Sequence, residues 1–230
     1  MEIIYWSDYA CPFCYIGRKH LEAAIEKVSK EKGENFTVTM KAFELDPSAP
    51  KLVAGTATER LASKYGLTME DAADRINGVN MMGQAVGIDF RYDLAKPSNT
   101  FDAHRITKLA QAKGNDVAEN LTELLYEAYF VKHEVLADHG VLLAKAKEAG
   151  LDKAEVKAVL DSEQFAHEVR EEEALAARYG INSVPFFVVN DKVALPGALP
   201  IEEFEKVLRE NARERGGAMN IHLLRRMAPN

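Results

Sequence analysis

The sequence Cys11-Pro12-Phe13-Cys14 decides how the rest of the chain is interpreted, because it holds the only two cysteines among 230 residues. A strand-like run, Glu2–Ser7, precedes it, and an amphipathic helix follows. Pro12 suits the first helical position, where its missing N–H costs nothing. Cys11 is then expected at the start of the helix, where backbone N–H groups and the positive dipole end favour a thiolate. Cys14 lies one turn further along, so the pair has the spacing of a dithiol redox centre.

Other roles are open to a cysteine pair of this spacing. It could form half of a zinc site completed by His133 and His139, although those histidines lie far away in a helical region. A structural disulfide would require an oxidising compartment, whereas a chain that begins at Met1 without a leader is expected in a reducing one. Two inert, buried cysteines would not need Pro12 between them. The redox interpretation is favoured, and no metal is expected.

Composition argues against several classes of function. The hydrophobic fraction of 47% supports a substantial core, and 29 basic against 36 acidic residues give a net charge of −7. This balance does not favour binding to nucleic acid or to an anionic membrane surface. No apolar run approaches the length of a membrane span, and the first strand begins too close to Met1 for a signal peptide. The sequence predicts a cytoplasmic protein and leaves the oligomeric state open.

Strands are predicted near both ends of the chain. Phe36–Phe43 alternates apolar and polar residues, which predicts a strand and, with the first strand and helix, a β-α-β unit. Val184–Val189 is an apolar run opened by a proline, Asn190-Asp191 predicts a turn, and Lys192–Leu195 predicts the returning strand. A final helix is expected from Pro200 to Arg213.

The middle of the chain has a different pattern. From about Thr56 to Tyr179, helical segments follow one another without a strand signal. Capping residues and glycines mark their ends; Asp152 with Glu155, for example, resembles a capping box. Within this block, Arg91–Asn99 is expected to be a loop.

Domain organisation follows from this order. Residues 1–50 and 180–215 are predicted to form one discontinuous domain around the sheet, and residues 51–179 an inserted helical domain. Residues 216–230 are Gly-rich and then basic, as in a disordered tail or in residues that are not native to the gene.

Taken together, several stretches resemble the DsbA-type thioredoxin fold and, more narrowly, its FrnE-like subfamily. These stretches are Ser7-Asp8, Cys11–Gly17, Phe43–Pro47, Ala103-His104-Arg105, Glu127–Phe130, Val184–Phe187, and Gly197-Ala198 with Pro200. The likeness covers almost the whole chain up to the tail. It implies an α/β, thioredoxin-like fold of order β-α-β … β-β-α with a large all-helical insertion. Phe13 departs from the usual Trp and Leu199 from an expected Gln, which bears on substrate preference more than on the chemistry.

The resemblance implies a thiol–disulfide oxidoreductase or isomerase acting on protein or small-molecule disulfides. Cys11 would attack the substrate disulfide, and Cys14 would resolve the mixed disulfide that results. No cofactor is expected to bind tightly, and glutathione or another thiol is the expected electron donor.

Four further residues are expected to tune the dithiol and position the substrate. Pro12 and Phe13 lie between the cysteines. The resemblance places Pro185, with a cis peptide bond, beside the cysteines, and it implies that the backbone of Val184 pairs with an extended substrate segment.

Two alternative functions remain at this stage. Kappa-class-like relatives of the same inserted fold are glutathione-dependent isomerases or transferases, but they typically carry Ser where Cys11 stands. A binding module of the holdase type, with incidental cysteines, is the other alternative.

Some other residues are expected to be structural. They are His104, the core or groove residues Tyr5, Trp6 and Tyr9, the core-filling Met81 and Met82, and the solvated run Glu171–Glu173.

Overall fold

The structure, a computed structural model, describes residues 1–212. The tail 216–230 and Arg213, the expected end of the last helix, lie outside the described residues. The chain divides into two compact units. The sheet unit comprises Met1–Phe43 and the residues from Arg170 onward, and the helical unit comprises Glu44–Val169.

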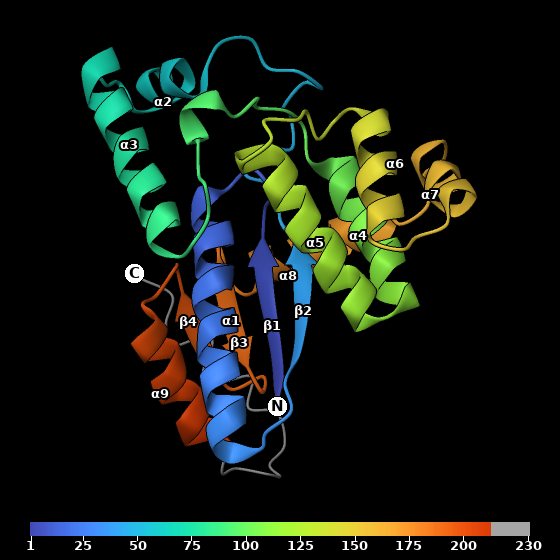
Figure 1. The fold of residues 1–230 in the computed structure, drawn as a ribbon. Coiled ribbons are helices and arrows are strands. Elements are labelled where there is room, and N and C mark those ends of the chain that lie inside the picture. Colours follow the sequence, from blue (N-terminus) through green and yellow to red (C-terminus); the bar gives the residue numbers. More distant parts are fainter. Residues whose placement is uncertain (213–230) are drawn as a thin grey trace. The chain divides into compact units, whose positions relative to one another are not determined.

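The sheet unit is built around a mixed sheet (Figure 1). Within the described residues the sheet has four strands in the order β2-β1-β3-β4. Their bounds are β1 Glu2–Ser7, β2 Thr37–Ala42, β3 Phe186–Val189 and β4 Val193–Pro196. β1 pairs with β2 in parallel and with β3 antiparallel, and β3 pairs with β4 antiparallel. Helix α1 (Pro12–Lys32) joins the parallel pair and α9 (Ile201–Asn211) follows β4, which confirms the expected thioredoxin-like α/β order.

The turn between β3 and β4 lies at the predicted residues. Asn190 and Asp191 have φ values of 51° and 53°, a left-handed conformation that these two residue types tolerate and that tight hairpins require. The N–H of Lys192 donates to the carbonyl of Val189 at 3.0 Å. Because Lys192 belongs to the turn, β4 begins one residue later than predicted and continues to Pro196.

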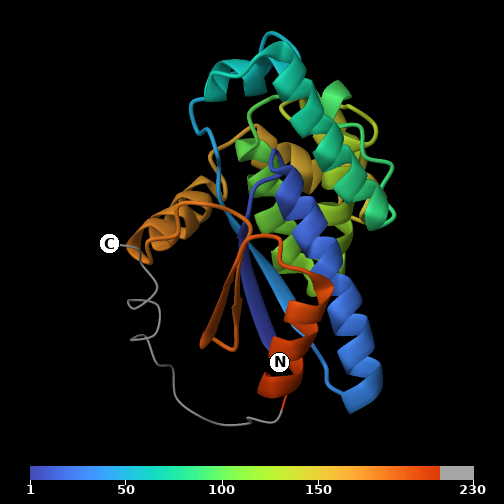
Figure 2. The ribbon, with the colours of Figure 1, turned by 90° about the vertical axis from the view of Figure 1, so that its left-hand side faces the viewer.

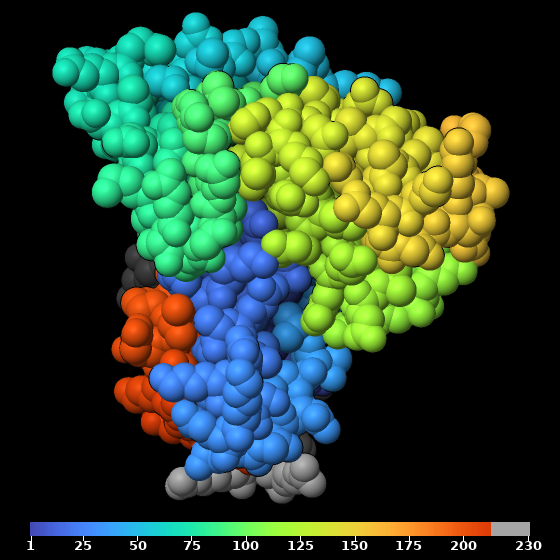
Figure 3. Space-filling view, viewed as in Figure 1, coloured from blue at the N-terminus to red at the C-terminus, as the bar shows by residue number. Residues whose placement is uncertain are grey.

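Helices cover both faces of the sheet (Figure 2). On the face covered by α1 and α9, Tyr5 stacks on Phe187 with ring centroids 5.3 Å apart, and Phe187 meets Phe204 of α9 edge-on at 5.0 Å. On the other face, Trp6 is fully buried in a cluster with Ala176 of α8 (Ala166–Arg178). Side chains of successive strand residues therefore point to opposite faces of the sheet and pack into two separate cores, one on each face. In the space-filling view, α9 lies alongside α1 (Figure 3).

Glu172 fastens α8 to the sheet, so the expectation that the whole acidic run is solvated is wrong. Its carboxylate accepts a hydrogen bond from the backbone N–H of Ala42 at 2.8 Å and pairs with Nζ of Lys41 at 3.0 Å. Its carbonyl oxygen accepts a bond from the indole Nε1 of Trp6 at 3.0 Å. One position of the run faces the end of β2, and composition alone does not distinguish that position from its neighbours.

The helical unit consists of consecutive helices, and four of them begin with a side-chain cap. The caps are Thr56, Thr68, Asp138 and Asp152. The bounds are α2 Ala57–Tyr65, α3 Met69–Ala85, α4 Phe101–Lys113, α5 Asn115–Phe130, α6 His139–Glu148 and α7 Lys153–Leu160. A short 3-10 helix, η1 Tyr92–Leu94, occupies part of the stretch expected to be a loop.

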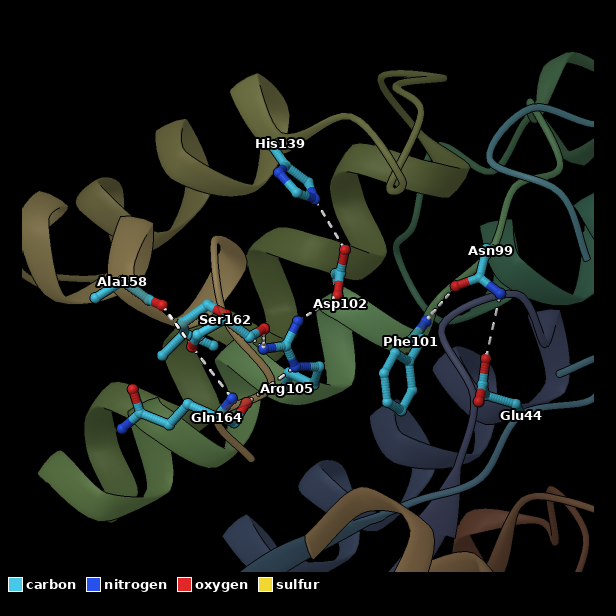
Figure 4. Close-up of polar contacts among 10 residues, drawn as sticks. Glu44, Asn99, Phe101, Asp102, Arg105, His139, Ala158, Ser162 and Gln164 are labelled. Atoms are coloured by element: carbon cyan, nitrogen blue, oxygen red, sulfur yellow. Dashed lines mark hydrogen bonds and ion pairs between the residues drawn. The ribbon is translucent and has the colours of Figure 1, made fainter. Parts of the chain in front are cut away.

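Arg105 is a polar anchor inside the helical unit (Figure 4). Its side chain is 3% exposed and donates to the carboxylate of Asp102 at 2.8 Å, which in turn lies 2.8 Å from Nε2 of His139. The guanidinium also donates to three backbone carbonyls near and beyond the end of α7, those of Val159, Ser162 and Gln164. Its neighbour His104 is buried as well, so this resembling stretch lies in the packed interior of its unit.

Met81 and Met82 do not fill a core, contrary to expectation, because they are 63% and 43% exposed. The buried side of α3 instead carries one large apolar residue, Ile76, together with Ala72, Asn80 and Gly83. These residues recur at helical spacing. A Cβ at Gly83 would lie 2.6 Å from the side chain of Phe90, so the helix packs closely there and the methionines point elsewhere.

Candidate active site

Cys11 lies at the N-cap of α1, as the sequence predicts. Its backbone is extended, with φ −94° and ψ 113°, and Pro12 takes the first helical position. Within the described residues, no side chain caps this helix start and no acidic residue lies in its first turn. The positive end of the helix dipole therefore faces Cys11 without a competing carboxylate in that turn.

Cys14 lies one turn further along and is fully buried, whereas Cys11 is 4% exposed. The N–H of Cys14 donates to the carbonyl of Cys11 at 3.1 Å, and the two sulfurs are not joined by a disulfide. Burial raises the pKa of the Cys14 thiol well above its usual value, and the hydrogen bond with the side chain of Cys11 adds to the increase. Hydrogen bonds from Ser7 and Asp8 act in the opposite direction. Cys14 is therefore held as a neutral thiol.

The loop Val184–Pro185 meets Cys11 although 173 residues separate the two contacting positions. The sulfur of Cys11 lies 3.6 Å from the carbonyl oxygen of Val184, to which a thiol can donate. The Val184–Pro185 peptide bond is cis, as the resemblance implies. Pro185 is buried and Val184 is half-buried. The structure thus brings the two motifs together.

Phe13 differs from its neighbours in exposure. Its side chain is 41% exposed, whereas Pro12 is buried. Among the described residues of the sheet unit, Phe13 is the one large hydrophobic side chain that is exposed to this degree. An apolar side chain thus lies in water between the two cysteines.

Sequence reasoning missed the contacts that surround this centre. His20 of α1 lies against the carbonyl of Leu199, with 2.7 Å between Nδ1 and the oxygen. Gly17 and Ala198, noted only as parts of resembling stretches, approach each other closely. Gly17 and Gly197-Ala198 both belong to stretches that resemble the family. Neither stretch, however, indicates that the two lie against each other in the fold.

A charged group also lies near Tyr5. Arg18 is buried and pairs with Glu22 at 2.8 Å. Burial raises the pKa of Tyr5, and the positive charge of Arg18 opposes the increase. Cys14 adds to the raised pKa of Tyr5, and no sequence pattern distinguished Tyr5 or Arg18 from ordinary core and helix-surface residues.

The alternative of a metal site gains no support. Among residues 1–212, no three His, Cys, Asp or Glu side chains come together as metal ligands would. Likewise, the described part of the chain holds no helix long and apolar enough to cross a membrane.

Comparison with known proteins identifies the family. The crystal structure of the probable DsbA oxidoreductase SCO1869 from Streptomyces coelicolor is 34% identical, with a TM-score of 0.87 and coverage of 96% of this chain and 94% of that one. The uncharacterised protein YwbO of Bacillus subtilis is 27% identical, over 94% of this chain and 99% of its own. The cytosolic disulfide reductase DsbM from Pseudomonas aeruginosa is only 16% identical, with a TM-score of 0.63 over 93% and 99% of the two chains, which shows a shared fold alone. The family model of the DSBA-like thioredoxin domain matches residues 2–209, and the chain therefore belongs to that family.

Proposed function

We propose that the chain is a thiol–disulfide oxidoreductase or isomerase that works through Cys11 and Cys14, as a FrnE-like member of its family. One observation carries the proposal. Cys11 lies at an uncapped helix start with its sulfur 3.6 Å from the Val184 carbonyl, while Cys14 is fully buried one turn on. Membership of a family of DsbA-like oxidoreductases supports the same chemistry.

The reaction proceeds in two exchanges. The thiolate of Cys11 attacks one sulfur of the substrate disulfide, so a Cys11–substrate bond forms, the substrate bond breaks, and the departing sulfur leaves as a thiolate that takes up a proton. Cys14 then loses its proton and attacks the sulfur of Cys11, which releases the second substrate thiol. The substrate gains two electrons and the dithiol loses two. In the reverse direction, the oxidised pair donates a disulfide.

The difference between the two thiols supports these two roles. The raised pKa of Cys14 keeps it protonated while Cys11 makes the first attack. The slight exposure of Cys11 makes it the sulfur that a substrate meets. The resolving step then needs no movement of Cys14 into solvent.

The surroundings of Cys11 indicate how a substrate is held. The backbone at Val184 offers hydrogen bonds to an extended segment of a protein or a small disulfide, with Pro185 fixing the loop. Phe13 offers an exposed apolar contact, and Pro12 starts the helix that has Cys11 at its N-cap.

The oxidised dithiol has to be reduced before the next turnover. Glutathione or another thiol reduces the oxidised pair, without a tightly bound cofactor.

The cysteine content bears on the cellular compartment. We place the reaction in the cytoplasm, because both cysteines of the chain belong to the dithiol and none is left for the structural disulfides that oxidising compartments favour.

Reduction of insulin disulfides by the full chain tests the proposal. Wild type should reduce insulin with a thiol donor, Cys11→Ser should be inactive, and Cys14→Ser should accumulate a mixed disulfide. Activity retained in Cys11→Ser would refute the assignment. Turnover of a glutathione-conjugating substrate by Cys11→Ser would favour the glutathione-dependent isomerase or transferase, and suppression of aggregation by the double-Ser variant would favour a holdase.

A further inference from the structure

We infer that His20 is a positioning residue for the dithiol. It holds the segment Gly197–Leu199 on α1, and that segment holds the loop that presents the Val184 carbonyl to Cys11. The inference rests on the proposed function and extends it to a residue that neither the motifs nor the family assignment marks.

The first contact joins α1 to the segment that follows β4. Nδ1 of His20 lies 2.7 Å from the carbonyl oxygen of Leu199, 179 positions away in the chain. A carbonyl oxygen can only accept a hydrogen bond, so Nδ1 carries the proton and donates. The bond fixes the backbone of Leu199, whatever the side chain at that position.

The second contact joins that segment to the loop before β3. The N–H of Gly197 donates to the carbonyl of Pro185 at 2.8 Å, and the N–H of Leu199 donates to the carbonyl of Gly197 at 3.0 Å. Val184 precedes Pro185 in the chain, and its carbonyl oxygen lies 3.6 Å from the sulfur of Cys11. One side-chain hydrogen bond and two backbone hydrogen bonds thus connect the imidazole of His20 to the loop beside the sulfur of Cys11.

A close approach at Gly17 shows how tightly this arrangement is set. A Cβ at Gly17 would lie 3.1 Å from Cγ of Pro185 and 3.2 Å from both Cα and Cβ of Ala198. These distances leave room for a hydrogen but not for a methyl group without displacement. The proline ring and the segment after β4 therefore rest directly on the backbone of α1, one helical turn before His20.

The consequence for the reaction depends on the substrate. An extended peptide uses the backbone at Val184 as a docking edge, so its reaction needs the loop in place. A small aromatic disulfide reaches the sulfur of Cys11 without that edge. Loss of the His20 bond should therefore slow peptide disulfides selectively.

Two probes with the same leaving group test the inference on the reduced full chain. One is 5,5′-dithiobis(2-nitrobenzoic acid), and the other is a short extended peptide whose cysteine carries 2-nitro-5-thiobenzoate as a mixed disulfide. In both reactions the dithiol is oxidised, the probe disulfide is reduced to two thiols, and the released thionitrobenzoate is followed by its absorbance. The variants are His20→Ala, His20→Asn, whose amide can donate in place of Nδ1, and Gly17→Ala. Lys27→Met is the matched control, because it also removes a long-range contact of α1, the 2.9 Å pair with Glu205 of α9, but leaves the Gly197–Leu199 segment untouched.

His20→Ala should lower the second-order rate constant for the peptide probe by about 3- to 10-fold, the range expected for one lost hydrogen bond. The rate constant for the small probe should stay unchanged. His20→Asn should recover most of the loss, Gly17→Ala should resemble His20→Ala, and Lys27→Met should match wild type with both probes. Hydrogen exchange of the Gly197 amide should accelerate in His20→Ala, a readout that needs no activity.

Equal rate constants in wild type and His20→Ala, or equal slowing with both probes, would overturn the positioning role. A wild type that reacts with neither probe would instead refute the proposed function, whatever the exchange of the Gly197 amide shows.

Discussion

Helix α1 and three helices of the helical unit, α2, α3 and α7, begin in different ways. Within the described chain, α1 starts at Cys11 with no side-chain cap and no acidic residue in its first turn. Helices α2, α3 and α7 start at Thr56, Thr68 and Asp152, whose side chains accept backbone N–H groups, and each has an acid in its first turn. Side-chain caps accept the free N–H groups at the start of a helix, and acidic residues there interact with the positive end of its dipole. The difference teaches that these three helices use their starts for stability, whereas α1 leaves its start to the sulfur of Cys11.

The largest effect is expected at the uncapped start. Cys11→Ser should reduce disulfide exchange to background, because a hydroxyl does not provide a comparable nucleophile. Folding should persist, because Ser is a favourable N-cap, and the free energy of unfolding should change by less than about 1 kcal/mol. Insulin reduction and urea unfolding measure the two quantities. A variant that fails to fold would show that Cys11 is structural.

In the helical unit, the largest loss of stability should come from Arg105. Arg105→Ala removes the hydrogen bonds of the buried guanidinium to Asp102 and to three backbone carbonyls, so the free energy of unfolding should fall by about 2–4 kcal/mol. Arg105→Lys should recover only part of this, since an ammonium lacks the planar fork. Denaturant unfolding measures both variants. The folded fraction of Arg105→Ala should still react with a small disulfide at the wild-type rate. A slower reaction of the folded variant would contradict the view that Arg105 contributes to stability and not to disulfide exchange.

Substitution of Phe13 should change the reduction potential of the dithiol at the start of α1. The wild-type potential should lie near the cytosolic glutathione poise of about −220 to −260 mV, well below the roughly −120 mV of periplasmic DsbA. Phe13→His adds a group that can donate to a thiolate or carry positive charge, so it should raise the potential by about 30 mV or more, equivalent to about 1.4 kcal/mol. Equilibration in glutathione buffers, followed by thiol trapping, gives both values. A wild type at the DsbA value would contradict the account.

Alkaline pH should reveal the raised pKa of Cys14. Because the pKa of Cys14 is raised in the folded protein, its contribution to stability is complete below the ordinary thiol pKa of about 8.5 and is lost as pH rises beyond it. The reduced protein should lose up to about 1.4 kcal/mol per pH unit above that point through this group. Urea unfolding of wild type and Cys14→Ala across this range isolates the contribution, since other titrations are common to both. If the unfolding free energies of the two proteins changed with pH in parallel, Cys14 would not be held protonated by the fold.

The smallest effect is expected at a capped start. Thr68→Ala removes the acceptor of the Asp71 N–H at 3.1 Å, so it should cost about 1 kcal/mol of unfolding free energy. Disulfide exchange should not change, as thermal unfolding and insulin reduction together would show. If exchange slowed as well, the caps of the helical unit would have a part in the chemistry.

Patterns along the chain were sufficient for the order of strands and helices and for the position of the cysteine pair. Helix-start signals placed Cys11 at the beginning of α1, whereas the thioredoxin-like fold and the contact of the Val184–Pro185 loop with Cys11 followed from the family resemblance. Contacts between distant residues without a motif were not predictable, such as His20 with Leu199 across 179 positions or Glu172 with Ala42 across 130. These depend on which side chain of a helix faces a particular backbone group.

The contact between Glu172 and Ala42 has a further consequence, for self-association. β2 and β4 are the outer strands of the sheet, and outer strands are where a second chain could add its own backbone. A strand arriving at β2 would have to break the Ala42 bond and bury the Lys41 charge. At β4, the short strand ends in Pro196, which has no N–H to offer. Concentrated solutions of this protein should therefore resist aggregation through sheet edges.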